Sequence, residues 1–216
     1  MIPLREIQGV QYGLLELSDL EAFSRLLAVT FSQYEPMGMA MGLSREEILT
    51  FVRLFGPKAA DEGLSLVAKI SDTDTMIGAL LSEDFGSPPP EGLGKMSKKL
   101  LPILTLLEQL DKQYMEKKEF RLGEVLHMFM VGVSPECTAR GVATHLSELG
   151  MEYAAVKGYR TAVVEATGSI SQNIARKLGF AERFSTLYKE FTFEGEKVFA
   201  SIEGHIGTML MDRMLV

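Results

Sequence analysis

The stretch that decides the fold is HMFMVGVSPECTARGVATHLSELGMEYA, residues 127–154. It begins as a largely apolar run, which Pro135 ends, and from Val142 onward it has the spacing of an amphipathic helix. Between the two lies TARG, in which Gly141 allows a tight turn and a close approach of a ligand to the backbone. The first turn of a helix has unpaired N–H groups and a partial positive charge. The pattern therefore predicts a strand, an anion-binding loop and a helix, in that order.

The loop does not match the two most familiar phosphate motifs. It lacks the lysine and the hydroxyl that end a P-loop. Of the glycines in a dinucleotide-binding fingerprint it has Gly141 alone, and the sheet before it is reached through a hairpin rather than a βαβ unit. An ordinary strand-to-helix turn remains the alternative interpretation of these residues.

Outward from this stretch the chain alternates strand and helix patterns. We expect strands at 10–17, 64–72, 75–84, 124–133, 159–166, 180–193 and 205–215, and helices at 18–32, 96–118, 143–157 and 169–178, with another after Ser44. Capping-box pairs mark two helix starts, Ser18 with Glu21 and Ser44 with Glu47. Between them QYEPMGMAMG, residues 33–42, predicts an irregular loop. The order predicts an α/β chain with one mixed, mostly antiparallel sheet and helices on both faces.

The composition indicates a globular protein without a nucleic-acid or membrane partner. Hydrophobic residues make up 46% of the 216 residues, and 22 basic against 29 acidic side chains give a formal charge of −7. That charge argues against nucleic acid or an anionic membrane as the main partner. No apolar run approaches the roughly 20 residues of a membrane helix, and the start of the chain lacks a signal peptide's apolar core. We therefore expect a cytoplasmic protein.

Cysteine and histidine supply no further site. A lone cysteine, Cys137, forms no internal disulfide and fits a reducing compartment. The three histidines, His127, His145 and His205, do not have the spacing of metal ligands, so no metal is expected.

Residues 127–180 resemble the core of the GNAT superfamily of acetyl-CoA-dependent N-acyltransferases. That core runs strand, V-x-P, a loop of the form [RQ]-x-x-G-x-[GA], helix, strand, helix and G-F. The positions that fill the pattern here are Val133, Pro135, Thr138, Gly141, Ala143, Gly179 and Phe180. One position departs from it, because Thr138 stands where the superfamily usually has Arg or Gln, and Arg140 follows two residues later.

Two further motifs resemble the insect-type arylalkylamine N-acyltransferase branch of that superfamily. They are FSQYEPMGMAMGLS, residues 31–44, and EATGSISQNIARKLGF, residues 165–180. The long helix before the fourth expected strand also fits this branch. The resemblance implies that residues 1–216 form a single GNAT domain with a helical insertion at about 94–118.

The resemblance also assigns roles to individual residues. Glu35 matches the proposed general base of the branch, which removes a proton from the incoming amine. Many superfamily members use a tyrosine as the general acid for the leaving thiolate, but here that position is Ala175. Ser171 matches the branch's serine and would donate to the sulfur or order a water, although a cap or first-turn role is the alternative. If Glu35 is not the base, Glu165 is the next candidate.

Acetyl-CoA is the co-substrate that the resemblance implies, and no metal is needed. Strand residues 130–133 would pair with the pantetheine arm as an added strand would, and the loop and helix start would hold the diphosphate. The expected coenzyme-binding residues are Met130, Val131, Val133, Thr138, Ala139, Arg140, Gly141, Val142, Ala143 and Thr144.

The expected activity is therefore transfer of an acetyl group to a small primary amine, of arylalkyl or polyamine type, directly in a ternary complex. Two alternatives remain open: acetylation of a peptide or protein amine, and a non-catalytic sensor that binds an acyl-CoA. A monomer and a homodimer both remain open as well.

Overall fold

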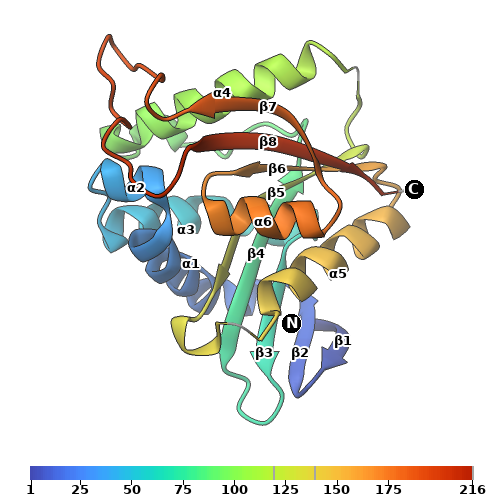
Figure 1. The fold of residues 1–216 in the computed structure, drawn as a ribbon. Helices are drawn as coiled ribbons and strands as arrows, with labels where there is room; N and C mark the ends of the chain where they lie inside the picture. Colours follow the sequence, from blue (N-terminus) through green and yellow to red (C-terminus); the bar gives the residue numbers. More distant parts are fainter. Residues whose placement is uncertain (119, 139, 216) are drawn as a thin grey trace.

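Figure 1 shows the computed structural model of the chain, which describes residues 1–118, 120–138 and 140–215. The strands are β1 (Ile2–Ile7), β2 (Val10–Leu14), β3 (Leu66–Ile70), β4 (Met76–Asp84), β5 (Val125–Val133), β6 (Thr161–Ala166), β7 (Ala181–Leu187) and β8 (Gly207–Met214). The α-helices are α1 (Leu20–Tyr34), α2 (Pro36–Ala40), α3 (Arg45–Glu62), α4 (Leu101–Met115), α5 (Val142–Val156) and α6 (Ser169–Lys177).

Within the described residues the strands form one eight-stranded sheet, in the order β1-β2-β3-β4-β5-β6-β8-β7. Every neighbouring pair is antiparallel except β5 and β6, which are parallel. A parallel pair needs a crossover connection, and α5 supplies it. The expectation of a mixed, mostly antiparallel sheet is therefore confirmed.

The two parallel strands separate soon after they pair. Their rungs run from Val125 opposite Thr161 to His127 opposite Val163 and then stop. Strand β5 nevertheless continues to Val133 while paired with β4, and β6 continues while paired with β8. Along the described parts of both strands, the two edges that face each other beyond these rungs are unpaired. This splay is the feature of the sheet that the site is built around.

Helices cover both faces of the sheet, and each face has its own apolar core. The first core lies under α1, α3 and α4 and includes Phe23, Val52 and Leu106. The second lies under α5 and α6 and includes Leu146 and Ala175. The helical layers can be followed in Figure 1, where α6 and α5 lie in front of the sheet and α4 runs beside β7. Helix α4 falls within the expected insertion, with Pro102 in its first turn.

Three local features differ from the sequence expectations. Strand β1 was not expected, because its side chains are mostly exposed and show no alternation. The stretch expected as a loop contains helix α2, which Pro36 at its first turn and Glu35 as its N-cap make stable. The prediction of a capping box at Ser18 and Glu21 is wrong, because α1 begins at Leu20 without a side-chain cap. The Ser44–Glu47 box is confirmed, with Glu47 N donating to Ser44 Oγ at 3.2 Å.

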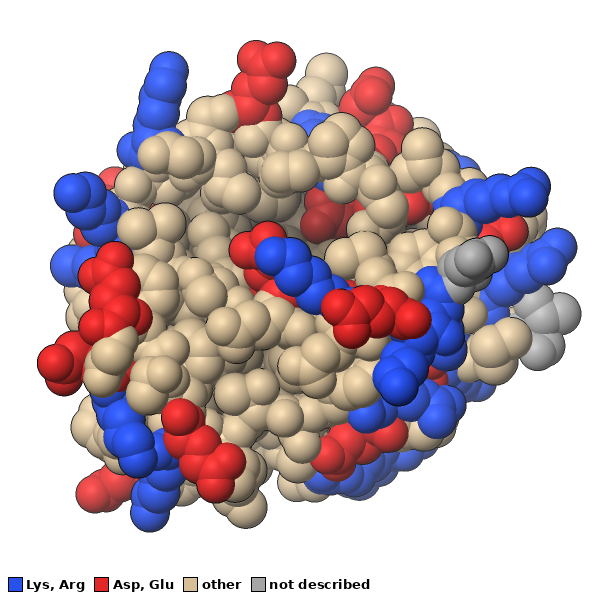
Figure 2. All heavy atoms as spheres, turned by 90° about the horizontal axis from the view of Figure 1, so that it is seen from above, with Lys and Arg blue, Asp and Glu red and all other residues tan. Residues whose placement is uncertain are grey.

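The charged side chains are mixed in sign on the face that Figure 2 shows. Lys and Arg lie beside Asp and Glu around the rim of this face, and another group of both signs lies near its middle. No helix within the described residues is long and apolar enough to cross a membrane.

Candidate active site

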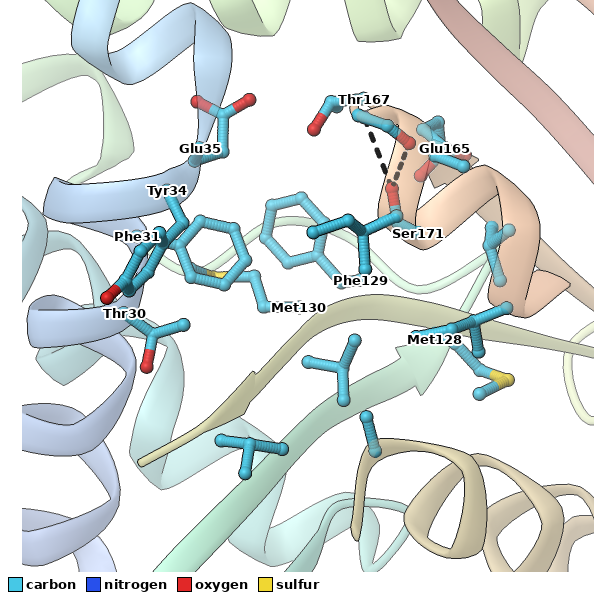
Figure 3. Close-up of a pocket in the computed structure, with 18 of the residues that line it drawn as sticks. Thr30, Phe31, Tyr34, Glu35, Met128, Phe129, Met130, Glu165, Thr167 and Ser171 are labelled. Carbon is cyan, nitrogen blue, oxygen red and sulfur yellow. Dashed lines mark hydrogen bonds between the residues drawn. The ribbon is translucent and has the colours of Figure 1, made fainter. Parts of the chain in front are cut away.

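A cavity of about 820 Å³ runs through the splay and is lined on both sides of the sheet. One end lies against the start of α5 and against α6, and we call it the α5 end. The other end lies among α1, α2, α3 and α4, and we call it the helical end. Figure 3 shows the region where they meet, with Glu35 on one side, Ser171 opposite, and Phe129 and Met130 of β5 between them.

The α5 end is built to receive an anion. Gly141 is the N-cap of α5 and has φ of 73°, a left-handed conformation that glycine adopts without strain. No side chain among the described residues caps this helix. The first-turn residues Val142, Ala143 and Thr144 all line the cavity. Their N–H groups have no partner within the helix, so a bound anion would satisfy them.

The neighbouring loop residues are placed less uniformly. Thr138 lines the cavity, and its hydroxyl donates to the Pro135 carbonyl at 3.2 Å. Arg140 is exposed and lines a separate depression of about 100 Å³ instead, together with Tyr12 and His145. Ala139, which the sequence also assigned to this site, lies outside the described residues.

The middle of the cavity follows the unpaired edge of β5. Met130, Val131 and Val133 line it, as the sequence predicts. Because the rungs to β6 end at His127, backbone N–H and C=O groups of β5 beyond that residue are open to a ligand. An extended ligand that enters the splay could pair with this edge as an added strand does.

Glu35 stands where the α5 end meets the helical end. Its carboxylate caps α2, accepting the N–H of Met37 at 3.2 Å and that of Gly38 in a shorter bond. Burial raises the pKa of Glu35 above its ordinary value, although the hydrogen bonds from Gly38, Met37 and the Thr167 side chain partly oppose this. A carboxylate with a raised pKa is a better proton acceptor than an exposed one.

A second buried group lies behind Glu35 and was not found from the sequence. The Tyr188 hydroxyl donates to the Thr167 carbonyl in a short bond and lies 3.2 Å from the Thr208 hydroxyl. Burial raises the pKa of Tyr188, so the phenol stays neutral. Thr167, Tyr188 and Thr208 thus hold the β6–α6 turn against Glu35. Only the fold brings these three positions together, because 41 residues separate the first from the last.

Ser171 lines the cavity at the first turn of α6. Its Oγ donates to the Gly168 carbonyl at 2.9 Å and accepts the Gly168 N–H at 3.2 Å, so the hydroxyl is engaged in a cap. His205 lies next to it and was also missed, because it comes from the loop before β8. Its Nδ1 accepts the N–H of Ser169 at 3.1 Å.

The helical end is largely apolar. Its walls are aromatic and aliphatic side chains from four helices and β5: Phe31, Met37, Ile48, Phe51, Ile103, Leu104, Leu107 and Phe129. Among the described residues, two acidic side chains line the cavity, those of Glu35 and Glu165. The Glu165 side chain is only 3% exposed, however, and its Oε2 lies 2.7 Å from His127 Nε2. Glu35 is therefore the one acidic group that the described lining offers to a ligand.

Comparison with known proteins places this fold. No family model matches the chain. The C-terminal condensation domain of Ebony in complex with beta-alanyl-dopamine is 16% identical, with a TM-score of 0.88 over 95% of this chain and 98% of that one. Arylalkylamine N-acetyltransferase 2 from Aedes aegypti is 18% identical, with a TM-score of 0.82 over 97% and 100%. A Drosophila melanogaster polyamine N-acetyltransferase that forms N-acetylagmatine is 16% identical, with a TM-score of 0.74 over 95% and 99%.

Likeness at this level of identity establishes the fold. It extends over nearly all of this chain and of each of the three others, so it concerns the fold as a whole. The expected resemblance is confirmed in that sense: this chain has the GNAT fold, in the form seen in the insect arylalkylamine and polyamine N-acetyltransferases.

Proposed function

We propose that this protein is an N-acetyltransferase that moves the acetyl group of acetyl-CoA to a small amine by direct transfer. One observation carries the proposal: a single cavity joins the uncapped start of α5, the unpaired edge of β5 and the carboxylate of Glu35. An anion site, a strand-like channel and a base in that order match the diphosphate, the pantetheine arm and the reacting thioester of acetyl-CoA.

The residues present fit acetyl-CoA at each of these points. The first-turn N–H groups of Val142, Ala143 and Thr144 would hold the diphosphate. Gly141 leaves the approach to them clear of a side chain, and the edge of β5 at Met130 and Val131 would pair with the amides of the arm. A β5 backbone N–H next to the thioester carbonyl would stabilise the negative charge that develops on its oxygen.

Glu35 acts as the base in this proposal. An amine arrives protonated at neutral pH, so it must lose a proton before its nitrogen can attack the carbonyl carbon. The C–N bond then forms, the C–S bond breaks, and the thiolate of CoA leaves. Ser171 lies on the cavity wall opposite and donates to the departing sulfur by exchanging its bond to the Gly168 carbonyl. Ala175, at the position of the usual tyrosine, leaves no phenol to do so.

The lining of the helical end favours an amine with one charge and an apolar, aromatic-sized tail. A diamine or a guanidine-bearing amine would bring a second cation into this end. Burying a charge without a partner is costly, and the Glu165 carboxylate is already bonded to His127. Aromatic walls such as Phe31, Phe51 and Phe129 instead suit an aryl ring. The arylalkylamine class is therefore proposed over the polyamine class.

Two alternative functions are less well supported. A peptide or protein amine would need an open groove, whereas this end is walled by side chains from four helices. A non-catalytic sensor would not need a carboxylate at the meeting point of the two ends, and Glu35 is there.

A thiol-release assay with acetyl-CoA and a panel of amines tests the proposal. The panel holds phenylethylamine-type monoamines, linear diamines, a guanidine-bearing amine and a lysine peptide. We expect release of CoA with the monoamines and a kcat/KM at least about tenfold lower with the diamines, since an unpaired charge costs more than 1.4 kcal/mol. Faster turnover of diamines would overturn the substrate class. Binding of acetyl-CoA without turnover of any amine would favour the sensor.

A further inference from the structure

A row of largely buried charged side chains lies beneath the splay and meets the cavity at Glu165. His127 of β5 bonds Glu165 of β6 through Nε2 and lies 3.2 Å from Glu83 of β4 through Nδ1. Glu83 in turn pairs with Lys58 of α3. His127 forms the last rung between β5 and β6, with Val163, and Glu165 lies two residues beyond Val163, so the His127–Glu165 bond lies where the two strands part. This row of side chains therefore links the two strands of the splay, β5 and β6, with α3, a helix that forms part of the cavity wall.

Asp111 of α4 adds a further member to this row of side chains, at its Glu165 end. Its Oδ1 and the Oε1 of Glu165 are both closed off from solvent, and neither has an N–H or O–H partner within the described residues. The two side chains are hydrogen-bonded to one another instead. Two carboxyl groups can share a hydrogen bond only if one of them carries a proton.

The surroundings decide which carboxyl is protonated. Burial, followed by the charge of Glu165, raises the pKa of Asp111 to about 8. Burial also acts to raise the pKa of Glu165, but the charge and hydrogen bond of His127 outweigh it and hold that pKa below its ordinary value. His127 keeps its proton, because Glu165 and Glu83 raise its pKa against the effect of burial. Counted from α4, the row therefore consists of a neutral acid (Asp111), a carboxylate (Glu165), an imidazolium (His127) and a second carboxylate (Glu83).

Helix α4 gives Asp111 its structural importance. Leu104 and Leu107 line the helical end of the cavity, and Asp111 follows Leu107 by four residues, so all three lie on one face of the helix. The hydrogen bond to Glu165 thus lies one turn beyond the residues that shape the wall.

We propose that Asp111 is a positioning residue, which fastens α4 to β6 through a hydrogen bond between its carboxyl group and that of Glu165 and thereby sets the wall of the helical end. This assignment rests on the proposed function only for the identity of what the cavity binds. Loss of the shared proton places two carboxylates against each other and releases the helix from the strand.

Other charged groups near α4 have partners of their own. On the helix itself Glu108 pairs with Lys112 at 2.9 Å, and both side chains are about two-thirds exposed. From β7 and β8, Arg183 and Asp212 pair with each other at 2.6 Å, and Asp212 also accepts from Tyr114 and Lys118. The charge of Glu108 also raises the pKa of Asp111, but it is a smaller cause than burial and Glu165, so Glu165, with His127 behind it, is the main charged partner of Asp111.

Asp111→Asn tests the proposal, because its amide donates to Glu165 at every pH. In the folded wild type Asp111 keeps a proton that the unfolded chain releases near pH 4. The contribution of Asp111 to the free energy of unfolding therefore falls as pH rises from about 4 to about 8, and it is constant above about pH 8. The asparagine variant has no such proton to lose. The difference in thermal midpoint between Asp111→Asn and the wild type should therefore grow in favour of the variant by roughly 2–5 °C per pH unit between pH 5 and pH 8, and it should stay constant above pH 8.

Glu108→Gln is the matched control, since it makes the same replacement of a carboxyl by an amide about one turn earlier, at an exposed position. Its difference from the wild type should vary far less with pH, because the charge of Glu108 raises the pKa of Asp111 less than burial and Glu165 do. Amide hydrogen exchange of α4 above pH 8 should be faster in the wild type than in Asp111→Asn at the same pH. A difference between Asp111→Asn and the wild type that is constant from pH 5 to pH 9 overturns the proposal.

Two further measurements cover the case in which Asp111→Asn does not fold and separate the role of Asp111 from the proposed function. If Asp111→Asn does not fold, infrared spectroscopy is decisive, because the wild type must show a protonated carboxyl that persists at pH 7 and changes its frequency in Glu165→Gln, where its partner becomes an amide. Absence of that band overturns the proposal. Affinity for an N-acetylated arylalkylamine, which is uncharged throughout, should fall above pH 8 in the wild type and not in Asp111→Asn. If the stability data hold and this compound does not bind at all, the proposed function fails and the role of Asp111 stands.

Discussion

The carboxylate of Glu35 accepts the backbone N–H of Met37 at 3.2 Å, so the group proposed as the base is also the cap of α2. A loss of activity on removing Glu35 would therefore have two possible causes. One is the absence of a base, and the other is a misplaced helix at the wall of the cavity. Substitutions that separate the two are available, because an amide can cap a helix but cannot take a proton from an amine.

Glu35→Gln and Glu35→Ala form that pair. We expect both to lower kcat/KM for the best amine by about 10²–10⁴-fold, the usual contribution of a general base. Glutamine keeps an oxygen for the N–H groups of Met37 and Gly38, so its thermal stability should match the wild type. Alanine should lose about 0.5–2 kcal/mol as well, because the cap is gone. Normal turnover by Glu35→Gln would move the base elsewhere, with Glu165 the next candidate.

The rate of the wild type should depend on pH through the same carboxylate. Burial raises the pKa of Glu35, and only the deprotonated form accepts a proton, so kcat/KM should rise as pH increases through that pKa. The midpoint should lie above 4.5, the ordinary pKa of a glutamate. Steady-state rates from pH 5 to pH 9 with one amine measure it. Glu35→Gln should lack this limb and keep the one that belongs to the amine itself.

Gly141 offers a matched test of the anion site. Asparagine and aspartate have the same shape, and both tolerate the left-handed conformation that this position needs better than other side chains do. Gly141→Asp alone places a negative charge beside the start of α5, so its affinity for CoA should be at least about tenfold below that of Gly141→Asn, a loss on the order of 1.5–3 kcal/mol. Calorimetry on the two folded variants measures the difference. Equal affinities would show that the diphosphate binds elsewhere.

Gly78 of β4 controls how closely α5 approaches the sheet. A Cβ at this position would lie 2.6 Å from Val142 Cγ1 and 3.0 Å from Leu146 Cδ1, so Gly78→Ala must push back the first turn of α5. Overpacking of this kind costs about 1–3 kcal/mol, and it should also weaken CoA binding because the N–H groups move. Gly94→Ala is the control, since among the described residues, its two chain neighbours aside, no atom lies within 4 Å of a Cβ placed there. Equal CoA affinity of Gly78→Ala and Gly94→Ala would contradict this role for the α5 start.

The sequence predicts the parts of this protein that local chemistry determines. Residues 127–154 already carry the strand, the turn at Gly141 and the helix, and the structure has β5, a left-handed Gly141 and α5 in those places. The Ser44–Glu47 cap was predicted because both of its partners lie within one turn. At Ser18 the same pattern misled, because the chain there first forms a short 3-10 turn at Leu17–Asp19.

The parts that depend on distant contacts were not predictable in this way. The segment between β7 and β8 brings His205 to the cavity wall and Tyr188 to the Thr167 carbonyl. No spacing in the sequence connects these two residues with Thr167 or Ser169. Glu165 was foreseen only as a substitute base. Its actual partners, His127 and Asp111, come from β5 and from α4, and only the packing of the helix on the sheet shows that the three groups meet.

Ser171 provides the last test, because its capping bonds and its proposed role in the reaction predict different results. If the hydroxyl only caps α6 through Gly168, Ser171→Ala should lower the thermal midpoint and leave kcat unchanged. If it also donates to the departing sulfur, kcat should fall about tenfold or more, the loss expected for one hydrogen bond to a charged atom. Affinity for CoA should change little in either case. We expect the fall in kcat, measured under saturating acetyl-CoA and amine, and an unchanged kcat would leave Ser171 as a cap alone.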